Sequence, residues 1–125
     1  MTEHTKEILP GCDVVLAMVR RSGECPTEAF LGSLDRRFLA RYQRYFERLR
    51  DNHSIKSPEN LRFLRSGSNG TQVFELKADK YRLYVVKHMM TWYTTHGVAK
   101  VKDNRVPGEI DKALSIFWEW NGAKQ

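Results

Sequence analysis

Hydrophobic and polar positions follow different periods along the chain, and each change of period marks a new element. Residues 13–20 form a short apolar run bounded by turn residues, which is typical of a strand buried on both faces. The stretch 69–102 contains three further apolar runs joined by tight polar turns. Short connections make neighbouring strands antiparallel, so we expect antiparallel strands at 73–78, 81–87 and 89–95. Another strand, at 61–65, precedes them across a turn whose Asn-Gly pair favours a hairpin.

Between the first strand and this stretch, apolar residues recur every three or four positions, which predicts helical structure. The pattern runs from Phe30 to Leu49 and fits one long helix, or two helices broken near Gly32-Ser33. Thr27 is the expected N-cap, and Glu28 then falls in the first turn, where the helix dipole favours an anion. The opposite face carries six arginines: Arg36, Arg37, Arg41, Arg44, Arg48 and Arg50.

A final helix is expected from Pro107, because proline suits the first helical position. Its apolar stripe consists of Ile110, Ala113, Leu114, Phe117 and Trp118. The order of elements is strand, helices, antiparallel strands and helix, which predicts an α+β fold. We expect a compact single domain over 1–125, with the N-terminal strand and a helical hairpin packed on a small, mainly antiparallel sheet that a C-terminal helix follows. Residues 1–12 are expected to form a flexible N-terminal tail.

Composition narrows the class of partner. A chain of 125 residues with 41% hydrophobic and 29% charged residues is typical of one ordinary soluble domain. Its formal net charge of +6 and pI near 9.5 favour polyanionic partners, which are nucleic acid, an anionic membrane or an acidic protein. The arginine face is therefore either a solvated surface, a surface that follows phosphates, or a docking face for an acidic segment.

Targeting and cofactor signals are weak. No stretch approaches the roughly 20 apolar residues that span a bilayer, and the first residues lack the apolar run of a signal peptide. We therefore expect a cytoplasmic protein without a membrane partner. Cys12 and Cys25 have no metal-ligand spacing and are expected as reduced thiols. No metal ion and no small-molecule cofactor are expected.

The stretch 69–102 and the basic loop after it carry the candidate chemistry. Arg82 is the first candidate for phosphate binding, because its planar guanidinium can contact two phosphoryl oxygens at once. The alternative for Arg82 is a cross-strand ion pair with Glu75. Lys100 and Lys102 share strand parity, so both point to one face if the strand continues past Gly97. They are candidates for phosphate contact or proton transfer, and an exposed basic loop is the other interpretation.

Further residues are candidates for acid–base chemistry and RNA contact. His96 has an ordinary pKa near 6.5, which suits a general acid or base, although a hydrogen-bonded structural imidazole is the alternative. Tyr93 can stack on an unpaired base, or it belongs to the core. The remaining candidate RNA contacts are the cations Lys77, Lys87 and Arg105, and a solvated strand is the alternative for Lys77.

Four short motifs in this region resemble those of the RelE/HigB group of bacterial and phage toxins, within the RelE/ParE superfamily. They are Glu75-Leu76-Lys77, Tyr81-Arg82, His96-Gly97-Val98-Ala99-Lys100-Val101-Lys102 and Pro107-Gly108-Glu109-Ile110-Asp111-Lys112-Ala113. The chain departs from the pattern at Lys77, where Arg is usual, and at Val98, where Phe is usual. Val101 separates two lysines that are usually adjacent. Some members also have a tyrosine near the C-terminus, whereas the last tyrosine here is Tyr93.

The resemblance implies a toxin of a type II toxin–antitoxin system that cleaves messenger RNA on the ribosome and is inhibited by a cognate antitoxin. Metal-independent cleavage through the 2′-hydroxyl needs a base, charge stabilisation of the phosphoryl oxygens and an acid for the leaving oxygen. The candidate catalytic residues are Arg82, Lys100, Lys102 and His96, and the candidate RNA contacts are Lys77, Lys87, Tyr93 and Arg105. Two alternatives remain: a non-enzymatic ParE-like toxin that poisons DNA gyrase, or an RNA- or ribosome-binding module without cleavage.

Overall fold

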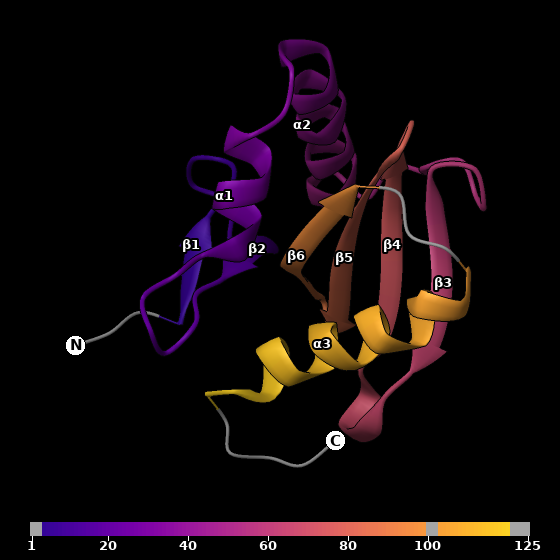
Figure 1. The fold of residues 1–125 in the computed structure, drawn as a ribbon. Helices are drawn as coiled ribbons and strands as arrows, with labels where there is room; N and C mark the ends of the chain where they lie inside the picture. The colour runs from indigo at the N-terminus through magenta and orange to yellow at the C-terminus, as the bar shows by residue number, and fades with distance from the viewer. Residues whose placement is uncertain (1–3, 100–102, 121–125) are drawn as a thin grey trace.

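A six-stranded mixed sheet forms the centre of the computed structural model, which describes residues 4–99 and 103–120 (Figure 1). The strands are β1 (Thr5–Glu7), β2 (Val15–Met18), β3 (Leu61–Ser66), β4 (Gln72–Ala78), β5 (Tyr81–His88) and β6 (Thr91–Ala99). The helices are α1 (Pro26–Gly32), α2 (Arg36–Arg50) and α3 (Val106–Trp118), with short 3-10 turns at Ser68–Gly70 and Asp103–Arg105. This arrangement confirms the expected α+β domain with a helix after the strands.

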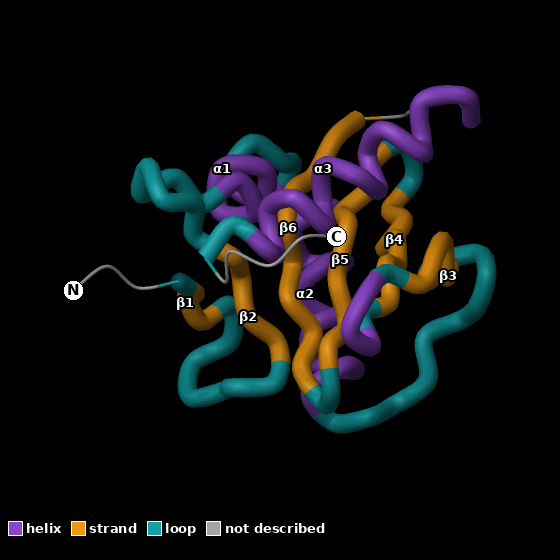
Figure 2. Tube along the Cα trace, turned by 90° about the horizontal axis from the view of Figure 1, so that it is seen from below, coloured by secondary structure: helices purple, strands orange, loops and turns teal. Residues whose placement is uncertain are grey.

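The strand order is β1-β2-β6-β5-β4-β3, so β1 and β3 are the two edges (Figure 2). From β3 to β6, each strand pairs antiparallel with the next one along the chain, as the short connections predicted. Strand β2 pairs with β6 in parallel, with Val15 opposite Trp92 and Ala17 opposite Thr94. A parallel pair needs a long crossover, and the two helices and three strands between β2 and β6 provide it.

Helices cover both faces of the sheet, and the alternation of side chains along β5 shows the division. Leu83 and Val85 belong to a core cluster with residues of α1 and α2. Tyr84 and Val86 belong to a second cluster with residues of α3. Successive strand residues point to opposite faces, so we name these the α2 face and the α3 face. All four residues are buried because both faces are covered there.

Two tyrosine hydroxyls fasten α2 to the edge of the β4–β5 hairpin. Tyr42 donates to the carbonyl oxygen of Leu76 over 3.1 Å, and Tyr45 donates to that of Lys77 over 2.7 Å. Burial raises the pKa of the Tyr42 hydroxyl, so it stays protonated and able to donate. Helix α2 is thereby fixed against the end of β4 that carries Lys77.

Several boundaries differ from those expected from the sequence. The helical pattern is two helices, and the first begins at Pro26 after Cys25, so Thr27 lies inside α1 and is not its N-cap. Proline has a fixed φ that suits the first helical position, which explains the earlier start. Strand β6 begins at Thr91, because Met89 adopts a positive φ of 58° and forms the hairpin turn with Met90. Both methionines are 81% exposed, so this apolar pair marks a turn.

The expected N-terminal tail at 1–12 contains a strand and buried residues in its described part. Residues 5–7 form β1 and pair antiparallel with β2. Leu9 and Cys12 are buried against the α2-face core. The stretch TKE lacks apolar alternation, so nothing in its own pattern indicates a strand. No described helix combines the length and apolar composition needed to cross a bilayer.

Candidate functional site

Lys77 and Arg82 lie directly opposite each other on β4 and β5. Residues in such a pair point to the same face, with their Cβ atoms roughly 5 Å apart. Arg82 is two positions before Tyr84, so the pair belongs to the α3 face. Two cations side by side repel each other, and a shared anion relieves that repulsion. The pair therefore has the charge and spacing of a phosphate contact.

The β4–β5 turn holds the Arg82 guanidinium. Its Nη1 donates to the carbonyl oxygens of Asp79 and Tyr81, over 2.7 and 2.8 Å. Among the described residues, no carboxylate lies within 4.0 Å of Lys77 or Arg82. The alternative of an ion pair between Arg82 and Glu75 is not formed. The remaining guanidinium donors of Arg82 are thus oriented without being neutralised.

Strand β6 continues past Gly97 to Ala99. A strand beyond Gly97 was the condition for Lys100 and Lys102 to point to one face. Val98 lies opposite Arg82, and Ala99 lies opposite Tyr81. Lys100 and Lys102 themselves fall outside the described residues, so their roles stay predictions. In sequence, Lys100 comes two positions after the residue that pairs with Arg82.

A second row of polar side chains lies next to this pair on the α3 face. It consists of Arg62, Glu75, Tyr84 and His96, which are opposite one another in register across β3, β4, β5 and β6. Glu75, Tyr84 and His96 are buried. Arg62 Nη2 lies 3.1 Å from Glu75 Oε1, and the rings of Tyr84 and His96 stack with centroids 5.0 Å apart. Burial raises the pKa of the Tyr84 hydroxyl, with a further contribution from the Glu75 carboxylate.

His96 connects this row to α3. Its Nε2 lies 2.8 Å from Glu109 Oε1 on α3, and its Nδ1 lies 3.2 Å from the hydroxyl of Thr95. Burial lowers the pKa of His96, and the hydrogen bond with Glu109 opposes that change. Both ring nitrogens are engaged and the ring is enclosed by α3 and the sheet. This geometry favours the structural interpretation of His96 over acid–base catalysis.

The other expected RNA contacts do not gather around Lys77 and Arg82. Lys87 lies on the α2 face, and its ammonium is 4.8 Å from the ring centroid of Trp92. Tyr93 lies on the α3 face and packs against Phe117, with ring centroids 5.1 Å apart, which favours a core role. Arg105 is exposed at the position just before α3. Only Lys77 and Arg82 of the described candidates form a pair.

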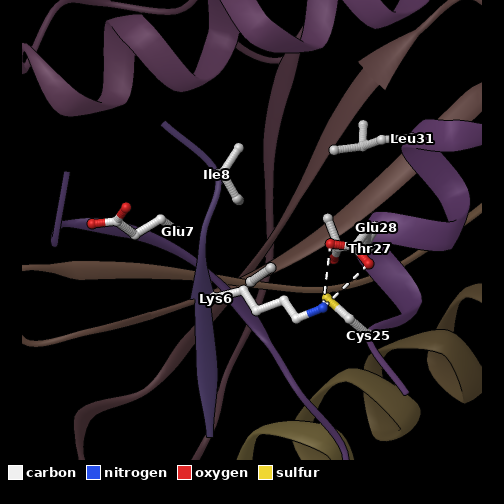
Figure 3. Close-up of a pocket in the computed structure, with 8 residues that line it drawn as sticks. Lys6, Glu7, Ile8, Cys25, Thr27, Glu28 and Leu31 are labelled. Atoms are coloured by element: carbon white, nitrogen blue, oxygen red, sulfur yellow. Dashed lines mark hydrogen bonds and ion pairs between the residues drawn. The ribbon is translucent and has the colours of Figure 1, made fainter. Parts of the chain in front are cut away.

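A cavity of about 170 Å³ lies between β1 and α1, away from these residues (Figure 3). Lys6 extends across it to Glu28, with the ammonium 3.2 Å from one carboxylate oxygen. Cys25 also lines it, and burial raises the pKa of this thiol, which makes it a poor nucleophile. None of the expected site residues lines this cavity, so we do not assign the function to it.

The sequence did not reveal Arg62 and Glu109 as members of the polar row. Their positions depend on the register of β3 and on the packing of α3, neither of which follows from local spacing. Within 4–99 and 103–120, no three His, Cys, Asp or Glu side chains form a group that could hold a metal ion. The sequence matches no family model, and comparisons with curated proteins and with solved structures yield no match.

Proposed function

We propose that the chain is a toxin of a type II toxin–antitoxin system that cleaves ribosome-bound messenger RNA. The observation that carries this proposal is the Lys77–Arg82 pair, two cations in register without a carboxylate partner among the described residues. It agrees with the motifs that resemble the RelE/HigB group. The order of strand, two helices, antiparallel strands and helix agrees with the same resemblance.

The chemistry assigned to the pair is electrostatic. Arg82 contacts the phosphoryl oxygens and stabilises the charge that develops on them, while Lys77 adds a second positive charge. The contacts with the carbonyls of Asp79 and Tyr81 orient the guanidinium before RNA binds, so less reorganisation is needed. Lys100 and Lys102 are the candidates for proton transfer or for a further phosphate contact. The proposed partners are a cognate antitoxin, the ribosome and its messenger RNA in the cytoplasm.

One observation favours a second candidate function. His96, an expected acid or base, is buried and engaged with Glu109. A chain with fewer groups for proton transfer also fits a non-enzymatic toxin that binds DNA gyrase, or a ribosome-binding module without cleavage. The experiment below separates these possibilities from cleavage.

The test is to induce the wild type and Arg82→Ala in a bacterium and to map the 5′ ends of cellular transcripts. Wild type should create new, codon-phased 5′ ends, and Arg82→Ala should reduce them by about 100-fold or more, because it removes a charge-stabilising group. Lys80→Ala is the matched control, because it removes a cation from the same hairpin. The Lys80 ammonium lies over the Tyr81 ring and is not part of the pair. It should cleave like the wild type.

Two results would contradict the proposal. A folded Lys77→Ala/Arg82→Ala variant that cleaves at the wild-type rate would show that the pair is not the site. DNA damage without new transcript ends would instead support gyrase poisoning. Circular dichroism of each purified variant confirms that it is folded.

A further inference from the structure

Helix α2 leaves one end of its sheet face open, as the side chains of β4 show. Ala78 and Leu76 are buried on this face, Phe74 is half-buried and Gln72 is exposed. Exposure therefore increases toward the start of β4, away from the tyrosine contacts of α2. The exposed Gln72 is opposite Ser66 of the edge strand β3 and opposite Lys87, next to the turn between β5 and β6.

Three aromatic rings from different strands meet on this open area. Phe63 on β3 contacts Phe74 on β4, with ring centroids 5.4 Å apart, and Phe74 contacts Trp92 on β6, with centroids 5.1 Å apart. The two pairs of ring planes are inclined by 67° and 60°, so the rings do not close into a stack on each other. Phe63 is 49% exposed. We call Phe63, Phe74 and Trp92 the aromatic strip.

Polar and positive groups flank the aromatic strip. The Lys87 ammonium lies 4.8 Å from the Trp92 ring centroid, and Gln72 is opposite Lys87 in register. Among the described residues, Lys87 has no carboxylate within ion-pair distance. The aromatic strip and its two flanking residues thus combine ring faces, the Gln72 amide, which can donate and accept hydrogen bonds, and the positive charge of Lys87.

This combination is complementary to single-stranded nucleic acid. Unpaired bases stack on aromatic side chains displayed on an open sheet surface, while cations contact the backbone. An apolar protein segment would leave the Lys87 charge and the Gln72 amide without partners, which costs free energy. The net charge of +6 further favours a polyanion.

We propose that the aromatic strip binds two or three consecutive unpaired nucleotides of RNA. Bases stack on Phe63 and Phe74, the Gln72 amide contacts a base edge, and Lys87 contacts a phosphate. The strip lies on the α2 face, so the sheet separates it from the Lys77–Arg82 pair on the α3 face. The inference goes beyond the proposed function because it concerns binding and needs no cleavage.

The test measures binding of a short fluorescein-labelled single-stranded RNA by fluorescence anisotropy. All proteins carry Lys77→Ala and Arg82→Ala, which removes the other candidate contact with RNA. Phe63→Leu in this background should weaken binding about tenfold, because it removes a stacking surface and keeps an apolar side chain. Phe63→Tyr should bind like the parent, and Lys80→Ala should change affinity less than about twofold.

Clear results would overturn the proposal. Equal affinity of Phe63→Leu and the parent would exclude stacking on this ring. Equal affinity for double-stranded and single-stranded RNA would exclude recognition of unpaired bases. The failure of the proposed function is distinguishable, because a chain without nuclease activity can still bind RNA here, and a nuclease can lack this binding. Phe63 is half-exposed on an edge strand, so these variants keep the core intact.

Discussion

Gly97 allows the ring of Phe30 to lie directly on the backbone of β6. A Cβ atom at this position would overlap the Cγ and both Cδ atoms of that ring. Phe30 is itself buried between Tyr42 and Tyr81, in edge-on contact with both rings. The ring therefore has little room to move, and the position requires the absence of a side chain.

We predict that Gly97→Ala lowers the free energy of unfolding by about 2–3 kcal/mol, because the added methyl group overpacks this site. Urea denaturation followed by circular dichroism measures the change. Phe30→Leu in the same chain should recover part of the loss, since the smaller side chain makes room. If the double variant loses as much free energy of unfolding as the two single variants together, or more, overlap with Phe30 is not the cause.

The sequence allowed part of the candidate site to be predicted residue by residue. Lys77 and Arg82 were each predicted to contact RNA, and the short turn between β4 and β5 places them opposite each other. The partner of Glu75 was not predictable. Glu75 pairs with Arg62 because of the register between β3 and β4. That register changes between Phe63 and Arg65, where the strand has a bulge.

At the scale of elements, hydrogen bonds and ion pairs connect α3 and the residue after it to the sheet and to the segment that follows β2. Glu109 near its start contacts His96, and Asp111 contacts Arg65 over 3.0 Å. Past its end, Glu119 accepts hydrogen bonds from Arg20 and from the backbone of residue 21, and the Arg20 contact holds the pKa of Glu119 below its usual value. The contact at His96 is the buried one, so we expect it to contribute most per group.

The burial of His96 should make stability depend on pH. Burial lowers the pKa of His96 below its ordinary value of 6.5, the charges of Lys112 and Arg20 add to that change, and Glu109 opposes it. As pH falls through 6.5, the unfolded chain therefore takes up a proton at this ring before the folded chain does. The stabilisation is present above that pH and is lost below it.

We predict that the free energy of unfolding of the wild type falls when the pH is lowered from about 7.5 to 5.5. Below the ordinary histidine pKa, the loss is at most about 1.4 kcal/mol for each pH unit. His96→Gln should be less stable at neutral pH and should depend less on pH over this range. Exposed His53 provides the matched control, and His53→Gln should keep the wild-type pH dependence. Parallel pH profiles for His96→Gln and the wild type would contradict the assignment. Urea denaturation at each pH gives the free energies.

Local patterns predicted most elements but not all of their ends. Apolar residues recurring every three or four positions predicted α2 and α3. Apolar runs joined by short turns predicted β4 and β5. Strand β1 was missed because its three residues are polar, and it is specified by pairing with β2. The start of β6 was misplaced because exposed Met89 and Met90 have the composition of a strand and the conformation of a turn.

At the scale of the whole molecule, the Lys77–Arg82 pair and Lys87 lie on opposite faces of one sheet, and none of the three has a carboxylate partner among the described residues. Lys77 and Arg82 are on the α3 face, and Lys87 is on the α2 face. A ligand that contacts both surfaces must pass around an edge of the sheet. The net charge predicted a polyanionic partner from the sequence, whereas the division into two surfaces depends on strand parity and on which helix covers which face.

We predict that RNA affinity falls with salt according to the number of these contacts. Three phosphate contacts, from Lys77, Arg82 and Lys87, give a logarithmic slope of about −2 for single-stranded RNA, which is roughly a 20-fold loss for a fourfold rise in salt. Anisotropy titrations at several salt concentrations measure the slope. The triple alanine variant should make the slope less negative by about 2, and an unchanged slope would place the contacts elsewhere.

The parallel pair of β2 and β6 has a consequence for how the protein is made. Val15 pairs with Trp92, so a strand synthesised early obtains this neighbour only when most of the chain has left the ribosome. Contacts between such distant segments form late and slowly, because the intervening loop must first be closed. Only then does β6 join β2 to the β5 hairpin, and both cationic surfaces become part of one sheet. The six-stranded sheet is therefore completed only after most of the chain has been synthesised.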